Sequence, residues 1–145
     1  MRAAMYSRAM ATCQHVLQTF FSAVESRDLD AIKHCFSEDA RYCNVPYDPA
    51  VGREAIGELF RPIVTRSERI EWQIVSSAYT EHRAHIERLD CFWIDGQRYA
   101  VPCHGVALID TARGVITEFR DYVDLGRWRA TLGDALTRKT GEVRP

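Results

Sequence analysis

Residues 84–94 have the sequence AHIERLDCFWI, and the alternation within this stretch decides how the chain is expected to fold. Successive side chains of a β-strand point to opposite faces of its sheet, so every second residue shares a face. One face then carries Ala84, Ile86, Arg88, Asp90, Phe92 and Ile94. A cation and a carboxylate lie within this otherwise apolar row, which predicts that both point toward a core or a pocket.

Burying Arg88 and Asp90 is expensive unless the two are paired and hydrogen-bonded. From this strand alone, two interpretations are open. The residues could form a structural ion pair that ties the strand to its neighbours. Alternatively, Asp90 could be a catalytic acid or base, because buried charges of this kind concentrate at functional sites.

Two further segments place polar side chains on apolar faces. In residues 115–124, the alternate positions that share a face are Val115, Thr117, Phe119, Asp121 and Val123. Asp121 is therefore a second carboxylate within an apolar row. In the shorter segment 40–45, Tyr42 and Asn44 share a face. The alternation predicts that these three polar side chains point into the same interior as the charged pair of residues 84–94.

The first half of the chain is dominated by the helical spacing of its apolar residues. This spacing predicts helices at 9–26, 28–36 and 53–64, the second of them capped by Asp28. Residues 37–39 are expected to turn the chain.

The second half changes to the alternating spacing that is typical of strands. Asp95-Gly96 is a strong signal for a hairpin turn. The predicted elements are strands at 69–79, 84–94, 98–109 and 115–124 and a closing helix at 125–136.

Helices followed by hairpin-connected strands indicate an α+β fold, with a strongly curved sheet that forms a cup beneath the N-terminal helices. The alternation sends five polar side chains into this cup: Tyr42, Asn44, Arg88, Asp90 and Asp121. Its walls are expected to come from Phe21, Val24, Trp72, Phe92, Val101, Cys103, Phe119 and Val123. A polar cluster in an apolar cup is the usual anatomy of a small-molecule site.

Length and composition describe one soluble domain. The chain has 145 residues, of which 46% are hydrophobic and 27% charged, enough for one core but not for a second domain. We expect a single domain over residues 1–145, with its core at 9–136 and a polar, poorly ordered tail at 137–145.

The charge balance gives no reason to expect nucleic acid or a membrane as a partner. The formal net charge is −1, and Lys and Arg are scattered along the chain. No segment approaches the length of a membrane span, and the N-terminus lacks the continuous apolar run of a signal peptide. The cytoplasm is therefore the expected location.

Cysteines and histidines give no pattern of metal ligands. The five cysteines are Cys13, Cys35, Cys43, Cys91 and Cys103. Their odd number and the absence of CxxC spacing argue against a disulfide framework and a zinc site. The five histidines are His15, His34, His82, His85 and His104, and none forms a ligand spacing with a cysteine or carboxylate on a shared face. No metal site is expected.

Three motifs resemble the active-site motifs of the limonene-epoxide hydrolase family in residue identity, order and separation. They are Tyr42-Cys43-Asn44, Arg88-Leu89-Asp90 and Phe119-Arg120-Asp121-Tyr122, and the likeness covers about residues 20–125. Members of that family share the cone-shaped fold of nuclear transport factor 2, scytalone dehydratase and ketosteroid isomerase. The resemblance thus implies a mixed sheet in an NTF2-like, SnoaL-like cone, and an epoxide hydrolase that needs neither metal nor organic cofactor.

A count of charge supports acid and base chemistry in such a site. Two carboxylates and one guanidinium carry a net charge of −1 when all are ionised, and one added proton makes the site neutral. The carboxylates are therefore expected to share a proton as a coupled pair near neutral pH. Opening an epoxide needs a base to deprotonate the attacking water and an acid to protonate the departing oxygen.

The resemblance implies how these two tasks are divided. Asp121 would be the base and would hold a water together with the Tyr42 hydroxyl and the Asn44 amide. Asp90 would be the acid, and Arg88 would orient both carboxylates. The expected substrates are a small apolar, cyclic epoxide and water.

The same cup also suits other activities. A ketosteroid-isomerase-like or polyketide-cyclase-like enzyme would use one aspartate to shuttle a proton. A non-catalytic module would use the cup only to bind a ligand. This chain departs from the limonene enzyme where Trp72, Phe92 and Cys103 replace aliphatic residues, and in a shorter N-terminus. Cups of this kind often associate through the outer face of the sheet, so fold analogy predicts a homodimer.

Overall fold

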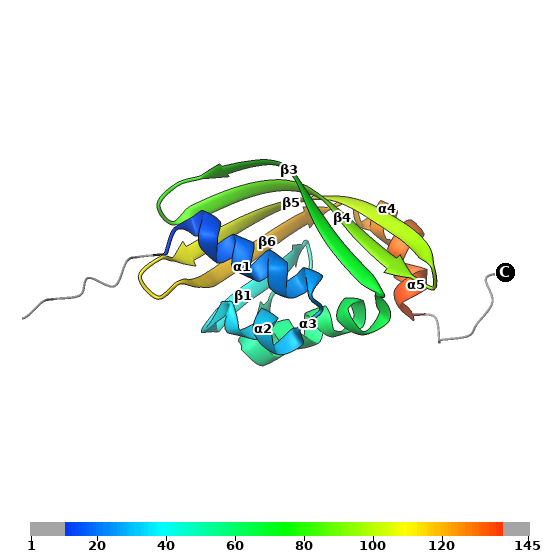
Figure 1. Ribbon diagram of the computed structural model, residues 1–145, viewed down its shortest axis with the longest axis horizontal. Coiled ribbons are helices and arrows are strands. Elements are labelled where there is room, and N and C mark those ends of the chain that lie inside the picture. The colour runs from blue at the N-terminus through cyan, green and yellow to red at the C-terminus, as the bar shows by residue number, and fades with distance from the viewer. Residues whose placement is uncertain (1–10, 138–145) are drawn as a thin grey trace, which may run out of the picture.

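The computed structural model describes residues 11–137 of the chain. A six-stranded, strongly curved sheet arches over α1, α2 and α3 (Figure 1). The strand order is β2-β1-β6-β5-β4-β3, in which β1 runs parallel to β6 and the other neighbours are antiparallel. The predicted α+β fold with a curved mixed sheet is confirmed.

The elements follow the order that the sequence predicts, with one addition: Ala50–Val51, which is not predicted as a strand, pairs with β1. The strands are β1 (Phe36–Val45), β2 (Ala50–Val51), β3 (Arg69–Tyr79), β4 (Arg83–Ile94), β5 (Gln97–Asp110) and β6 (Val115–Val123). The helices are α1 (Cys13–Glu25), α2 (Leu29–His34), α3 (Arg53–Arg66), α4 (Leu125–Trp128) and α5 (Asp134–Thr137), with a π-helical turn at Arg129–Gly133 between the last two.

The first two helices begin at side-chain caps. Thr12 accepts a hydrogen bond from the His15 N–H at 3.1 Å, so α1 begins later than the predicted residue 9. Residues 9 and 10 of that prediction lie outside the described range. Asp28 accepts from the Ala31 N–H at 3.0 Å, which confirms the predicted cap of α2.

A cluster of aromatic rings holds α1 against the concave face of the sheet. Phe20 on α1 is fully buried at the centre of this cluster. Its ring centroid lies between 5.1 and 5.8 Å from those of Phe21, Phe36, Phe60, Trp72 and Phe119. Such tilted and edge-to-face contacts are favourable beyond the burial of apolar area. The cluster joins α1, α3 and three strands in one core.

The predicted hairpin is present, but the predicted turn at residues 37–39 is wrong. Asp95 and Gly96 have φ angles of 52° and 76°, as a tight turn between β4 and β5 requires. Residues 37–39 instead belong to β1, whose register with β6 shifts between Phe36 and Arg41. The three polar residues thus mark an irregularity within a strand, which their composition does not distinguish from a turn.

The closing segment is helical, but it is not the single helix predicted at 125–136. A π-helical turn at Arg129–Gly133 separates α4 from α5. The side chains expected to face inward do so: Leu132 and Ala135 are buried, and Trp128 and Leu136 are half-buried. Thr137, predicted to open the tail, belongs to α5, and residues 138–145 of that prediction lie outside the described range.

None of the helices within residues 11–137 is long and apolar enough to cross a membrane.

Candidate active site

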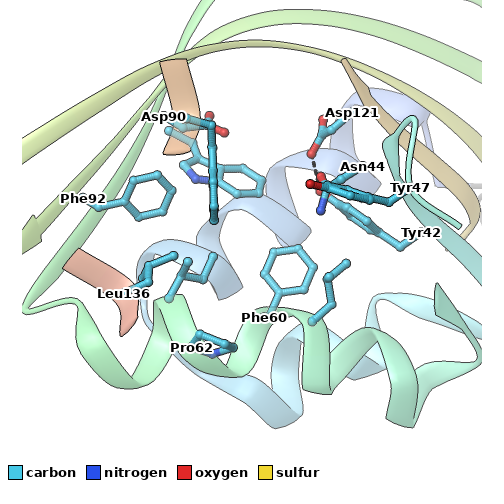
Figure 2. Close-up of a pocket in the computed structure, with 13 residues that line it drawn as sticks. Tyr42, Asn44, Tyr47, Phe60, Pro62, Asp90, Phe92, Asp121 and Leu136 are labelled. Carbon is cyan, nitrogen blue, oxygen red and sulfur yellow. Dashed lines mark hydrogen bonds between the residues drawn. The ribbon is translucent and has the colours of Figure 1, made fainter. Parts of the chain in front are cut away.

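A cavity of about 290 Å³ lies between the concave face of the sheet, α3 and the closing helices. Its polar lining residues are Tyr42, Asn44, Asp90 and Asp121. Its other lining residues are Tyr47, Leu59, Phe60, Pro62, Ile63, Trp72, Phe92, Trp128 and Leu136. Figure 2 shows the two aspartates on the side formed by the sheet and Phe60 and Pro62 on the opposite side. The polar groups therefore face an apolar wall across the cavity.

Strand register brings the polar residues together. Asn44 on β1 is paired with Asp121 on β6, so the two side chains share a face of the sheet. Arg88 and Asp90 point to the same concave face from β4, as their alternation predicts. Arg88 is 1% exposed and Asp90 is 7% exposed. The structure thus brings together all five residues that the sequence analysis sent into the cup.

Arg88 binds both carboxylates through its guanidinium. Its Nε and Nη2 donate to Asp90 Oδ1 and Oδ2 at 2.7 and 3.1 Å. Its Nη1 and Nη2 donate to Asp121 Oδ1 and Oδ2 at 2.9 Å each. Each carboxylate is therefore bound in a bidentate manner, through two hydrogen bonds, for which the planar guanidinium is suited.

The indole ring of Trp72 supports the same guanidinium from its face. The Arg88 Cζ lies 4.3 Å from the centroid of this ring, within the range of a cation–π interaction. Cys103 lies on another side, where its Sγ accepts a hydrogen bond from Arg88 Nη2 at 3.4 Å. The guanidinium of Arg88 is therefore contacted on its face by Trp72 and at its edges by hydrogen-bond acceptors.

Tyr42 supports the second carboxylate. Its hydroxyl donates a hydrogen bond to Asp121 Oδ2. Its ring stacks on that of Phe119, with centroids 5.1 Å apart and an interplanar angle of 4°. Burial, followed by the charge of Asp121, raises the pKa of the Tyr42 phenol well above its usual value, so the phenol stays neutral and remains a donor.

The two aspartates differ in their surroundings. Burial raises the pKa of Asp90 to about 6, and this effect outweighs the opposing charge and hydrogen bonds of Arg88. The negative charge of Asp121 makes a smaller contribution to this rise. Asp90 is therefore a carboxyl group that holds a proton in mildly acidic solution while it faces the cavity.

The predicted wall residues separate into two groups. Trp72 and Phe92 line the cavity. Phe21, Val24, Val101, Cys103, Phe119 and Val123 do not reach its lining: the first five are buried in the core and Val123 is half-buried. Alternation along a strand settles which face of the sheet a side chain takes, but not its depth relative to the cavity.

Most of the apolar wall was not assigned from the sequence. Leu59, Phe60 and Ile63 come from α3, and Trp128 and Leu136 come from the closing segment. Their helical spacing gives the signal that could have identified them, since each lies on the apolar stripe of its helix. Tyr47 follows β1, and its hydroxyl accepts a hydrogen bond from Arg129 Nη2.

Gly105 on β5 is a further residue on which the site depends. A Cβ at this position would lie 2.7 Å from Arg88 Nη1, 2.8 Å from Phe119 Cε1 and 2.9 Å from Asp121 Oδ1. These separations are shorter than a carbon atom allows. The backbone of β5 therefore leaves the space that the guanidinium and the second carboxylate occupy.

Within residues 11–137, no three His, Cys, Asp or Glu side chains are grouped in a way that could hold a metal ion.

Residues 17–119 match the SnoaL-like domain family. The chain belongs to this family. The matched segment spans most of the SnoaL-like cone, from α1 to β6, and includes Tyr42, Asn44, Arg88 and Asp90.

Similar solved structures include both epoxide hydrolases and cyclases. An LEH-like epoxide hydrolase from Mycobacterium tuberculosis is 26% identical, with a TM-score of 0.66 over 77% of this chain and 78% of that one. A candidate SnoaL-like polyketide cyclase from Shewanella denitrificans is 14% identical, with a TM-score of 0.73 over 83% and 96%. SalBIII, an epoxide hydrolase/cyclase-like enzyme in pyran ring formation of salinomycin, is 22% identical, with a TM-score of 0.67 over 79% and 92%. The last two likenesses concern the fold alone.

The close approach at Gly105 predicts a stability defect. We expect Gly105→Ala to lower the free energy of unfolding by about 1–3 kcal/mol, because the added methyl group must displace Arg88 or Asp121. Gly133→Ala is the matched control, since a Cβ there meets nothing closer than 3.6 Å. Urea unfolding of both variants measures the difference. A Gly105→Ala protein as stable as the Gly133→Ala protein would contradict the packing described.

Proposed function

We propose that this SnoaL-like domain is a cofactor-independent epoxide hydrolase. It converts a small apolar, cyclic epoxide to a vicinal diol by one-step attack of water. The observation that carries the proposal is Arg88, which binds two buried carboxylates at the wall of an apolar cavity. Similarity to the M. tuberculosis LEH-like epoxide hydrolase gives independent support.

Asp121 is the general base in this mechanism. Its carboxylate accepts hydrogen bonds from Arg88 and Tyr42, which fix its orientation. Asn44 lines the cavity beside it, so a water that contacts the Asp121 carboxylate also comes within reach of the Asn44 amide. The base removes a proton from this water as the water oxygen attacks an epoxide carbon.

Asp90 is the general acid. A carboxyl group with a pKa of about 6 carries a proton for part of the time near neutral pH and gives it up readily. It protonates the epoxide oxygen as the carbon–oxygen bond breaks. One proton thus leaves water for Asp121 and another leaves Asp90 for the product, and Arg88 remains bound to both carboxylates while their charges exchange.

An isomerase or cyclase is the second candidate function. The observation in its favour is that a protonated Asp90 can donate a hydrogen bond to the same cavity, as enolate-stabilising sites require. The bridging cation favours the hydrolase, because an oxyanion site of neutral donors does not need it. A turnover screen over terpene, cycloalkene, styrene and steroid epoxides, with a steroid enone alongside, separates the two.

The two aspartates should be indispensable for hydrolysis. We expect Asp90→Asn and Asp121→Asn each to lower epoxide turnover by at least about 10²-fold, because an amide can neither give nor take the required proton. Asp110→Asn is the matched control, since Asp110 pairs with Arg113 outside the cavity. Circular dichroism establishes that each variant is folded. Near-normal hydrolysis by either site variant would disprove the assignment.

The rate should fall as the pH rises through about 6. Catalysis needs Asp90 in its protonated form, and the fraction in that form decreases above the Asp90 pKa of about 6. Above that pH, we expect kcat/KM to fall by about tenfold per pH unit. Initial rates between pH 4.5 and pH 9, on the order of one reading per half unit, measure the profile. A rate that rises through pH 6 would mean that Asp90 acts as the base.

Direct attack by water predicts where its oxygen goes. In a single turnover in ¹⁸O-labelled water with enzyme in excess, we expect the label in the diol, because Asp121 is placed to activate water and not to form an ester. An ester intermediate would instead deliver unlabelled carboxylate oxygen to the diol. Mass spectrometry of the diol and of the peptides that contain Asp90 and Asp121 measures both. Label on either aspartate would contradict the one-step mechanism.

A further inference from the structure

The cavity wall is far richer in aromatic side chains than the chain as a whole. Aromatic residues make up 10% of the sequence, yet they are six of the thirteen residues that line the cavity. The six are Tyr42, Tyr47, Phe60, Trp72, Phe92 and Trp128. Figure 2 shows the rings of Phe92, Phe60 and Tyr42 around the space beneath the two aspartates. Aromatic faces carry partial negative charge, which attracts cations at close range.

The charges at this wall are negative on balance. Among residues 11–137, the ionisable side chains that line the cavity are two tyrosines and two aspartates, with no Lys, Arg or His. Arg88 behind the wall offsets one of the two carboxylates, and its Nε, Nη1 and Nη2 all donate hydrogen bonds to them. Arg129, which donates to Tyr47, is exposed, and solvent screens its charge. With both aspartates ionised, the site carries a net charge of −1.

We propose that this cavity binds a small tertiary or quaternary ammonium cation. Such a cation presents apolar methyl groups to aromatic rings while its charge offsets that of the carboxylates. A neutral hydrocarbon of the same shape gains only the apolar contacts. The cavity volume of about 290 Å³ suits a trimethylammonium group with a short tail.

The inference concerns the cavity itself and does not depend on the proposed hydrolase activity. The two are nevertheless compatible in their electrostatics. Acid-assisted opening of an epoxide builds partial positive charge on the carbon under attack. The same aromatic faces and carboxylates that attract an ammonium group would stabilise that charge.

Choline and its neutral isostere 3,3-dimethylbutan-1-ol provide the test, because they differ by a quaternary nitrogen in place of a carbon. We expect choline to bind the full chain at least about tenfold more tightly at pH 8, as measured by isothermal titration calorimetry. Equal affinities, or no binding of choline, would overturn the proposal. This experiment measures binding and not turnover. The choline result therefore tests the ammonium proposal even if the protein does not hydrolyse epoxides.

Neighbouring residues on β4 give a matched pair of variants. Phe92 lines the cavity, whereas Trp93 points to the opposite face, where the Arg69 Cζ lies 4.4 Å from its ring centroid. We expect Phe92→Leu to weaken choline binding by roughly fivefold with little effect on the isostere, because Leu keeps the apolar bulk but not the ring. Trp93→Leu should change neither affinity. Equal loss of both ligands in Phe92→Leu would mean that the ring acts only as apolar surface.

The pH dependence of the preference identifies the charge involved. The groups that face Asp90 are Arg88 on its own strand, Asp121 on β6 and Cys103 on β5, with Tyr42 behind Asp121. Burial raises the pKa of the Tyr42 phenol and of the Cys103 thiol, so both are neutral at pH 8. Protonation of Asp90 makes the site neutral, so we expect the preference for choline to decrease severalfold at pH 5. A preference unchanged between pH 5 and pH 8 would exclude Asp90 as its source.

Discussion

Arg88 carries a permanent charge at a position where only 1% of its surface is exposed, and the remaining architecture of the site follows from that constraint. Removing a guanidinium from water costs several kcal/mol unless its donors are satisfied and its charge is opposed. Asp90 and Asp121 meet both requirements from two different strands. Since one carboxylate would suffice to neutralise the cation, the second gives the site an exchangeable proton.

The sheet is built so that this pairing can occur. β4 and β6 are not neighbours, because β5 lies between them. The Arg88 side chain must therefore cross the backbone of β5 to reach Asp121, and it does so over Gly105, where a side chain would leave no room. The ion pair between β4 and β6 therefore depends on both the strand order and the glycine. The close approach of Arg88 and Asp121 explains why position 105 of β5 is a glycine.

Features that depend on one strand or one turn could be predicted from the sequence. Whether a side chain reaches the cavity or lies behind its lining could not be predicted, and neither could irregular backbone. The alternation around Arg88 identified the buried charges, and Asp95-Gly96 identified the hairpin. The alternation could not tell that Phe119 lies behind Tyr42 while Trp128, far along the chain, reaches the cavity. The irregularity in β1 and the π-helical turn have no distinct composition, so the sequence predicts a turn at the first and a regular helix at the second.

The apolar wall and the charged wall impose opposite demands on a ligand, and this limits what the cavity can accept. A fully apolar molecule offers no hydrogen bond and no charge to the carboxylates. An anion is repelled by them, and within residues 11–137 no Lys, Arg or His lines the cavity to attract it. A molecule with one polar centre and apolar surroundings satisfies both walls. An epoxide does so through an oxygen that accepts a proton, and an ammonium ion does so through its charge. The proton on Asp90 decides between them, because a protonated carboxyl favours the acceptor and an ionised one favours the cation.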